Sequence, residues 1–322
     1  MSAAYRAPWW LPGGHLQTIY PFFFLRQRLP RYRRERWDTP DGDFIDLDWV
    51  DGPPAGPLLA LFHGLEGSSA SHYATAIMNA VARTGWRGVV VHFRGCGGEP
   101  NRLPRAYHSG DAGEIDWILK RLNGLAAQAP LFAAGVSLGG NALLKWLGRE
   151  RAQAARAIRA AAAISAPMDL TTAGDRLCRG FNLAYGHLFM RTLRRKSLAK
   201  LQRFPGLYDG EKVRRSRTLR QFDDLVTAPL HGFRDTDDYW TRASSKPDLA
   251  HIETPTLIVH ARNDPFLPEP YLPAPAEVPA AVELDFPEGG GHAGFASGPF
   301  PGNLDWLPGR LLAFFGKRAD TR

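Results

Sequence analysis

Apolar runs alternate with amphipathic stretches through the middle of the chain. The short apolar-rich runs have the length and continuity of buried strands, at 57–63, 88–93, 131–136 and 158–165. Between them, apolar residues recur with helical spacing at 72–84, 114–125 and 142–150. Continuous apolar strands separated by helices predict a parallel sheet that is covered by helices on both faces.

This alternation stops after Pro167 and resumes near the C-terminus. Residues 168–245 contain no clear buried-strand run, whereas 256–261 and 282–287 again have the pattern of strands. We therefore predict an α/β fold with a mostly parallel central sheet, helices on both faces and an inserted helical cap. The predicted units are an irregular N-terminal arm with the first strands (1–56), a core (57–167 and 246–322) and the cap (168–245).

Composition is typical of a soluble globular protein, with 44% hydrophobic and 22% charged residues among 322. The two cysteines, Cys96 and Cys178, are too few for a disulfide framework, which favours a reducing compartment. No apolar stretch approaches the roughly 18 residues that a membrane span requires, and the first residues lack the pattern of a secretory signal. The sequence thus predicts a cytoplasmic protein.

A formal net charge of +8 raises the question of an anionic partner. The densest basic runs are 26–36 and 191–200, and aromatic residues lie just before the first of them. The favoured interpretation is that the aromatic residues pack on the main domain and the arginines are solvated. The alternative is peripheral membrane contact through this N-terminal aromatic and arginine segment. No nucleic-acid-binding motif is present, and no nucleic-acid partner is expected.

One pentapeptide has the pattern of a catalytic turn. Gly135-Val136-Ser137-Leu138-Gly139 matches G-x-S-x-G and lies after an apolar strand and before a predicted helix. In a nucleophile elbow, the serine occupies a strained turn that exposes its hydroxyl above the sheet. A plain strand-to-helix turn with a capping serine is the alternative.

A serine hydroxyl needs a base, and the base needs an orienting carboxylate. His292 lies in a glycine-rich loop after the last predicted strand, and Asp264 follows the preceding strand in an Asn-Asp-Pro turn. Both positions agree with the chain order serine, acid, histidine. The other candidate acids are Asp169, Asp285 and Glu288.

An oxyanion also needs backbone donors. We expect one from the N–H of Leu138, directly after the serine, and one from Leu65 in the glycine-containing loop 63–67. His63 is interpreted as a residue that organises this loop, and Cys96 as a packing residue rather than a thiol nucleophile. No metal-ligand spacing or nucleotide-binding loop is present, so the sequence implies no metal and no cofactor.

Six stretches together resemble the α/β-hydrolase superfamily, and within it the YheT-like branch of esterases and lipases. They are PGGHLQTI (12–19), HGLEG (63–67), FRGCGGEPNRLPRAYHSGD (93–111), GVSLGGN (135–141), NDPF (263–266) and GGHAGF (290–295). The resemblance implies a Ser137–Asp264–His292 triad and hydrolysis of carboxylic esters. It also implies that the segment 238–240 ends the cap.

The function predicted from the sequence is that of a serine esterase acting on a small-molecule ester with an apolar acyl chain. An acyltransferase would use the same residues, with an alcohol or amine in place of water. A non-catalytic protein that binds lipid or a partner on the same fold is the alternative from another class.

Overall fold

The computed structural model describes residues 4–126 and 128–319 and contains one eight-stranded sheet. The strand order across the sheet is β1-β2-β4-β3-β5-β6-β7-β8. Strand β2 is antiparallel to both β1 and β4, and the remaining pairs are parallel. The strands are β1 (Arg33–Asp38), β2 (Phe44–Val50), β3 (Leu58–Phe62), β4 (Arg87–His92), β5 (Leu131–Val136), β6 (Ala160–Ile164), β7 (Thr256–Val259) and β8 (Val282–Asp285). The predicted α/β fold with a mostly parallel sheet is confirmed.

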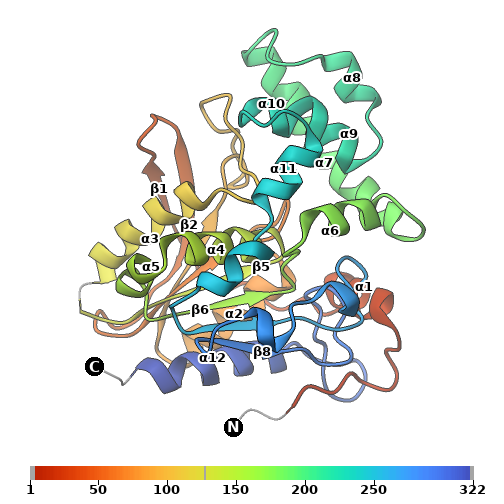
Figure 1. Cartoon of the computed structure of the whole chain (residues 1–322). Helices are drawn as coiled ribbons and strands as arrows, with labels where there is room; N and C mark the ends of the chain where they lie inside the picture. The colour runs from red at the N-terminus through yellow and green to blue at the C-terminus, as the bar shows by residue number, and fades with distance from the viewer. Residues whose placement is uncertain (1–3, 127, 320–322) are drawn as a thin grey trace.

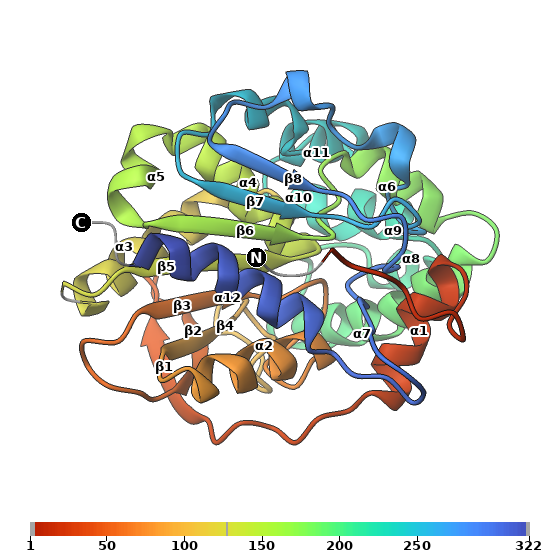
Figure 2. The same ribbon diagram turned by 90° about the horizontal axis from the view of Figure 1, so that it is seen from below.

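Helices cover both faces of the sheet (Figure 2). One face carries α2 (His72–Arg83) and α12 (Trp306–Ala319), and the other carries α3 (Ala112–Ala126), α4 (Leu138–Glu150) and α5 (Ala152–Ala157). Alternate side chains of a strand point to opposite faces. In β3, Leu59 and Leu61 therefore pack toward α2 and α12, while Phe62 packs toward α3 and α4.

Between β6 and β7 the chain forms a helical layer beside the carboxyl ends of the parallel strands (Figure 1). It has small apolar clusters of its own, one of which joins Met190, Val213 and Phe222. Its helices are α6 (Leu170–Leu177), α7 (Asn182–Arg203), α8 (Gly210–Arg215), α9 (Leu219–Phe222), a π-helical turn (Asp223–Thr227), α10 (Ala228–Leu230) and α11 (Thr236–Ala243). We call these elements the cap; its exact boundaries with the core remain a prediction.

Short 3₁₀ helices follow the cap. They are η2 (Lys246–His251), η3 (Glu269–Tyr271) and η4 (Pro275–Glu277). Asn141 of α4 fastens the end of the cap to the core, because its side-chain amide donates to the carbonyl of Ala243 at 2.9 Å and accepts the N–H of Ser245 at 3.0 Å. Among the described residues, no helix is both long and apolar enough to cross a membrane.

The N-terminal segment differs from the irregular arm that the sequence predicts. Residues Gly14–Phe24 form a helix, α1, even though Pro21 lies inside it. A proline removes one backbone donor and is disfavoured in a helix interior, so local residue preferences do not predict a helix here. Tertiary contacts of Gln17 and Thr18, both buried, hold the helix against the loops that follow β7 and β8.

Candidate active site

Ser137 occupies a sharp turn between β5 and α4. Its backbone has φ 53° and ψ −120°, a left-handed conformation that a residue with a side chain rarely adopts. The flanking glycines make this turn possible, since a Cβ on Gly139 would lie 2.5 Å from the carbonyl oxygen of Phe62. The elbow is therefore pressed against the end of β3, and Ser137 lines the cavity above the sheet.

His292 lies between Ser137 and Asp264. The Oγ of Ser137 is 2.9 Å from Nε2 of His292, and Nδ1 of the same ring is 2.9 Å from Oδ2 of Asp264. An ionised carboxylate can only accept, so Nδ1–H donates to Asp264 and leaves Nε2 to accept the serine proton. The structure thus brings together the serine, histidine and aspartate singled out in the sequence.

Asp264 is suited to remain ionised beneath the histidine. It is 1% exposed, and its Oδ1 accepts the backbone N–H of Phe266 at 2.8 Å. Burial by itself would raise the pKa of this carboxyl group. The adjacent rings of His292 and His260, together with the two hydrogen bonds, outweigh burial and hold the pKa of Asp264 below its usual value.

Each of the other candidate acids has a different structural role. Asp169 is the N-cap of α6, where its carboxylate accepts a backbone N–H at 3.0 Å. Asp285 pairs with Arg310 at 2.6 Å, and Glu288 lies 3.3 Å from Arg262. None of these three contacts is with His292, so the structure does not place Asp169, Asp285 or Glu288 as its hydrogen-bond partner among the described residues.

Two backbone N–H groups are available beside Ser137. Those of Leu65 and Leu138 have no hydrogen-bond acceptor among the described residues, and both residues line the cavity with Ser137. The N–H of Leu138 belongs to the first turn of α4, where helix donors lack intrahelical partners. The loop that carries Leu65 closely approaches the elbow, because a Cβ on Gly64 would lie 3.1 Å from the Cβ of Ser137.

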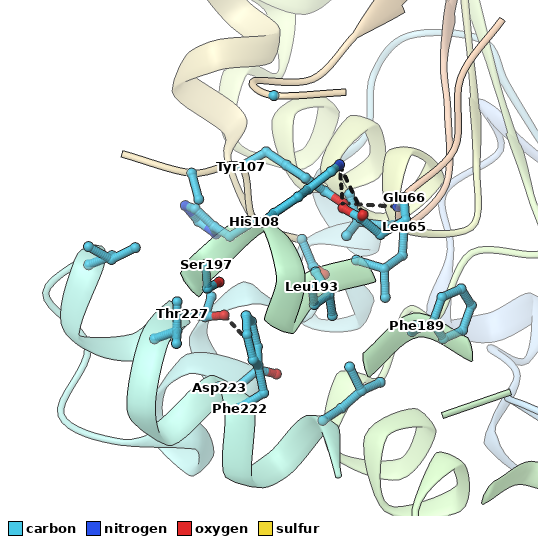
Figure 3. A pocket seen from close by; sticks show the side chains of 18 of the residues that line it. Leu65, Glu66, Tyr107, His108, Phe189, Leu193, Ser197, Phe222, Asp223 and Thr227 are labelled. Atoms are coloured by element: carbon cyan, nitrogen blue, oxygen red, sulfur yellow. Dashed lines mark hydrogen bonds and ion pairs between the residues drawn. The ribbon is translucent and has the colours of Figure 1, made fainter. Parts of the chain in front are cut away.

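Glu66, next to Leu65, is held from two sides (Figure 3). The Oη of Tyr107 accepts its backbone N–H at 2.9 Å and donates to its Oε1 at 2.8 Å. Lys196 from cap helix α7 pairs with Oε2 at 2.9 Å. Because the backbone of Glu66 has a positive φ of 55°, these contacts hold the loop in a conformation that few residues would adopt alone.

His63 and Cys96 have structural surroundings. His63 is fully buried; its Nδ1 lies 2.7 Å from the carbonyl of Gly64, and its Nε2 accepts the N–H of Phe93 at 3.1 Å. Burial lowers the pKa of His63 to about 3, which keeps the ring neutral. Burial raises the pKa of Cys96 to about 11, so its thiol stays protonated near neutral pH. Both observations agree with the roles expected from the sequence.

Gln17 belongs to the stretch PGGHLQTI, and its role is visible only in the structure. In the structure, Oε1 of Gln17 accepts the N–H of Gly290 at 2.7 Å and the Nδ2 amide of Asn263 at 2.9 Å. Its Nε2 donates to the carbonyl of Leu11 at 2.8 Å. One buried side chain therefore ties the loop before His292 to the loop that carries Asp264.

Thr18 holds the histidine itself. Its Oγ1 accepts the backbone N–H of His292 at 2.8 Å and donates to the carbonyl of Gly14 at 2.7 Å. The contact is close enough to require glycine in the loop, since a Cβ on Gly291 would lie 2.7 Å from the oxygen of Gly14. The only sequence signal for these roles was the position of both residues in a family-specific stretch.

Replacing Gln17 with leucine should lower both turnover and stability. The variant leaves the N–H of Gly290 and the amide of Asn263 without their acceptor, at about 1–3 kcal/mol for each buried group. A displaced histidine loop should lower kcat for a short-chain ester about 10- to 100-fold. Kinetics and thermal unfolding would be compared with Gln27→Leu as the control. A kcat within twofold of the wild-type value would contradict the assigned role.

A cavity of about 620 Å³ extends from Ser137 and His292 into the cap. Its apolar wall includes Leu65, Leu170, Phe189, Leu193, Phe222 and Trp240.

Two charged side chains of the cavity wall, Lys200 and Asp223, form hydrogen bonds with neighbouring groups. Burial lowers the pKa of Lys200 to about 8, and its Nζ donates to the carbonyls of Leu103, Pro104 and Arg105. Burial raises the pKa of Asp223 to about 6, and Thr227 and Trp240 donate to its carboxylate.

The comparisons with known proteins agree with this fold. Residues 57–299 match the family described as the alpha/beta hydrolase fold. The chain is 40% identical over 302 residues to YheT of Escherichia coli (strain K12), which bears the name of an esterase; the match covers 92% of this chain and 88% of that protein. Phospholipase ABHD3 of Mus musculus is 30% identical over 301 residues, covering 90% of this chain and 73% of that protein.

The solved structure of Est1E from Butyrivibrio proteoclasticus with ferulic acid bound has the same fold. The TM-score is 0.57 at 15% identity, over 89% of this chain and 100% of that one. The protein therefore belongs to the α/β-hydrolase fold family. Within the family it belongs to the YheT-like branch, as its sequence motifs predict.

Proposed function

We propose that this α/β hydrolase cleaves carboxylic esters with Ser137 as nucleophile, His292 as general base and Asp264 as the group that orients the histidine. The observation that carries the proposal is the pair of 2.9 Å contacts on the two ring nitrogens of His292, at the base of an apolar cavity. The names of the relatives, an esterase and a phospholipase, support ester hydrolysis.

Acylation begins when Oγ of Ser137 attacks the ester carbonyl carbon and its proton passes to Nε2 of His292. The carbonyl oxygen becomes an oxyanion, to which the free N–H groups of Leu65 and Leu138 donate. Loss of one such donor typically costs about 3–4 kcal/mol of transition-state stabilisation. The carboxylate of Asp264 stabilises the imidazolium, which then protonates the leaving alcohol.

Deacylation repeats these steps with water. His292, neutral again, removes a proton from a water molecule that attacks the acyl carbon, and the resulting imidazolium returns a proton to Oγ of Ser137. The carboxylic acid product then leaves the cavity. Leucine, phenylalanine and tryptophan side chains in the wall favour an ester with an apolar acyl chain of short to medium length.

The first test is labelling with a fluorophosphonate, followed by peptide mapping of the adduct. We expect a single adduct at Ser137, together with hydrolysis of p-nitrophenyl esters that has an optimum between acetate and palmitate. Absence of both labelling and turnover would reject the serine-hydrolase mechanism and favour a non-catalytic binding protein. Turnover that appears only when an alcohol acceptor is added would instead favour acyl transfer.

The cap should influence the chemistry through Lys196. Replacing Lys196 with methionine removes the cation that holds Glu66 beside the proposed oxyanion donor, and kcat for p-nitrophenyl acetate should fall about tenfold. Lys196→Arg should retain most of the activity, and Lys212→Met in exposed α8 serves as the control. The acetate ester is small, so its use limits the effect of lost acyl-chain contacts. A loss confined to long-chain esters would argue against the positioning role.

A further inference from the structure

A group of aromatic side chains is exposed along α1 and the adjoining loop after β8. We call it the aromatic ridge; it consists of the exposed Trp9, Phe22, Phe23, Phe24 and Phe300 together with the half-buried Trp10 and Tyr20. Ring contacts with centroids 4.8 to 6.5 Å apart link six of these residues, because Trp10 touches Tyr20 and Phe300, Tyr20 stacks on Phe24, and Phe23 touches both Phe24 and Phe22. The sequence predicts that the aromatic residues of the N-terminal segment pack on the main domain; Trp10 and Tyr20 do so, whereas Trp9, Phe22, Phe23 and Phe24 are exposed.

The exposure of the ridge is large for apolar side chains. Trp9 is 91% exposed, Phe300 73% and Phe24 70%. Scattered apolar residues are normal on protein surfaces, but a contiguous exposed patch usually marks a binding surface. Phe181, 58% exposed at the start of cap helix α7, meets the first turn of α1 through His15, with ring centroids 4.7 Å apart. The cap therefore contacts α1 beside an exposed aromatic side chain of its own.

The basic run 26–36 divides into two parts with different contacts. The later arginines are Arg33, Arg34 and Arg36, and each of them pairs with an aspartate in β2 or just after it. The earlier arginines are Arg26, Arg28 and Arg31, and all three are exposed. None of them pairs with a carboxylate within residues 4–126 and 128–319. Since Arg26 lies two residues after Phe24, unpaired positive charge directly borders the ridge.

We propose that the aromatic ridge and these three arginines bind the protein to the surface of an anionic phospholipid bilayer. Aromatic rings are favoured at the level of the lipid headgroups, where their apolar bodies meet the acyl chains. Guanidinium groups at the same level bind headgroup phosphates and respond to anionic lipid. This proposal concerns binding alone and does not depend on the proposed esterase mechanism.

A bilayer fits the surface better than single-stranded nucleic acid does. Base stacking needs open ring faces, whereas Tyr20 and Phe24 stack on each other at 5.2 Å with an interplanar angle of 28°. Three consecutive phenylalanines also offer apolar area with no hydrogen-bonding group, which suits acyl chains. The buried Gln17 and Thr18 lie in the first half of α1 and the exposed phenylalanines in its last turn, so membrane contact would be made by the helix that also holds the histidine loop.

The test is co-sedimentation of the full chain with vesicles of phosphatidylcholine, with and without phosphatidylglycerol, at low and high salt. We expect binding that increases with phosphatidylglycerol and decreases with salt. The variant Trp9→Ser/Phe23→Ser/Phe24→Ser should partition at least about tenfold more weakly at either salt concentration. The variant Arg26→Glu/Arg28→Glu/Arg31→Glu should bind phosphatidylglycerol vesicles no better than pure phosphatidylcholine.

Matched controls separate this surface from general properties of the chain. Leu125→Ser removes an exposed apolar side chain from α3, and Arg149→Glu/Arg156→Glu/Arg159→Glu makes the same change in net charge on exposed positions elsewhere. Both controls should retain clear binding to phosphatidylglycerol vesicles, and circular dichroism would verify the fold of every variant.

Several results would overturn the proposal. The first is that the wild-type chain does not sediment with phosphatidylglycerol vesicles, and the second is that the aromatic variant binds them as well as the wild type does. The third is that the wild-type chain forms a stable dimer and does not bind vesicles, whereas the aromatic variant is monomeric. Tight binding to a single-stranded oligonucleotide in place of vesicles would also overturn it. Because none of these measurements requires turnover, a failure of the esterase proposal would remain distinguishable.

Discussion

Ser137→Ala is expected to lower kcat for the best p-nitrophenyl ester roughly 10⁵- to 10⁶-fold. The methyl group cannot attack the carbonyl carbon, so no acyl-enzyme forms. The N–H groups of Leu65 and Leu138 remain and could stabilise only a direct attack by water, which leaves a small residual rate. The same variant should lose labelling by a fluorophosphonate completely.

The control is Ser68→Ala, which alters a serine outside the cavity lining and should change kcat by less than about twofold. Thermal unfolding of both variants would verify that the fold is retained. If Ser137→Ala kept a tenth of the wild-type activity, the nucleophile would be another residue, and the adduct map would identify it.

The second large effect is expected from Asp264→Asn, which should lower kcat about 10⁴-fold. An amide can present its NH₂ group to His292, and the ring would then accept at Nδ1 and carry its proton on Nε2. In this tautomer, Nε2 cannot remove the proton from Ser137. The variant also lacks the negative charge that stabilises the imidazolium, so the loss should persist across the pH range.

Asp169→Asn is the matched control for this substitution. Asp169 caps α6 through one backbone N–H, and asparagine is an equally good cap. Its kcat should therefore stay within about twofold of the wild-type value. Equal losses of kcat in the two variants would contradict the assignment of Asp264. A larger loss of kcat in Asp169→Asn would identify Asp169, in the loop after β6, as the acid of the triad.

Much of the fold was predictable because its signals are local. The apolar run predicted at 131–136 is β5, Leu131–Val136, and the run predicted at 88–93 overlaps β4, Arg87–His92. Chain order and loop position also singled out Ser137, Asp264 and His292, because the carboxyl ends of parallel strands meet at one edge of a sheet. In the structure these three side chains lie within hydrogen-bonding distance of one another in the order serine, histidine, aspartate.

The N-terminal helix was not predictable in this way. Within α1, Pro21 and a run of phenylalanines give no clear helical period, and the helix is held by contacts with residues far along the chain. Thr18 bonds to His292 across 274 positions, and Gln17 bonds to Asn263 across 246. Contacts between residues so far apart in the chain produce no periodic pattern in the sequence around either residue.

The sequence by itself therefore determined the fold class, the order of the candidate triad and the presence of a basic aromatic segment. Only the tertiary structure decided which donors hold the histidine loop, that Lys196 reaches Glu66 across 130 positions, and that the phenylalanines of α1 are exposed. The physical reason is the range of the interactions. Helix and strand patterns arise from neighbouring residues, whereas burial and long-range hydrogen bonds depend on the packing of the whole chain.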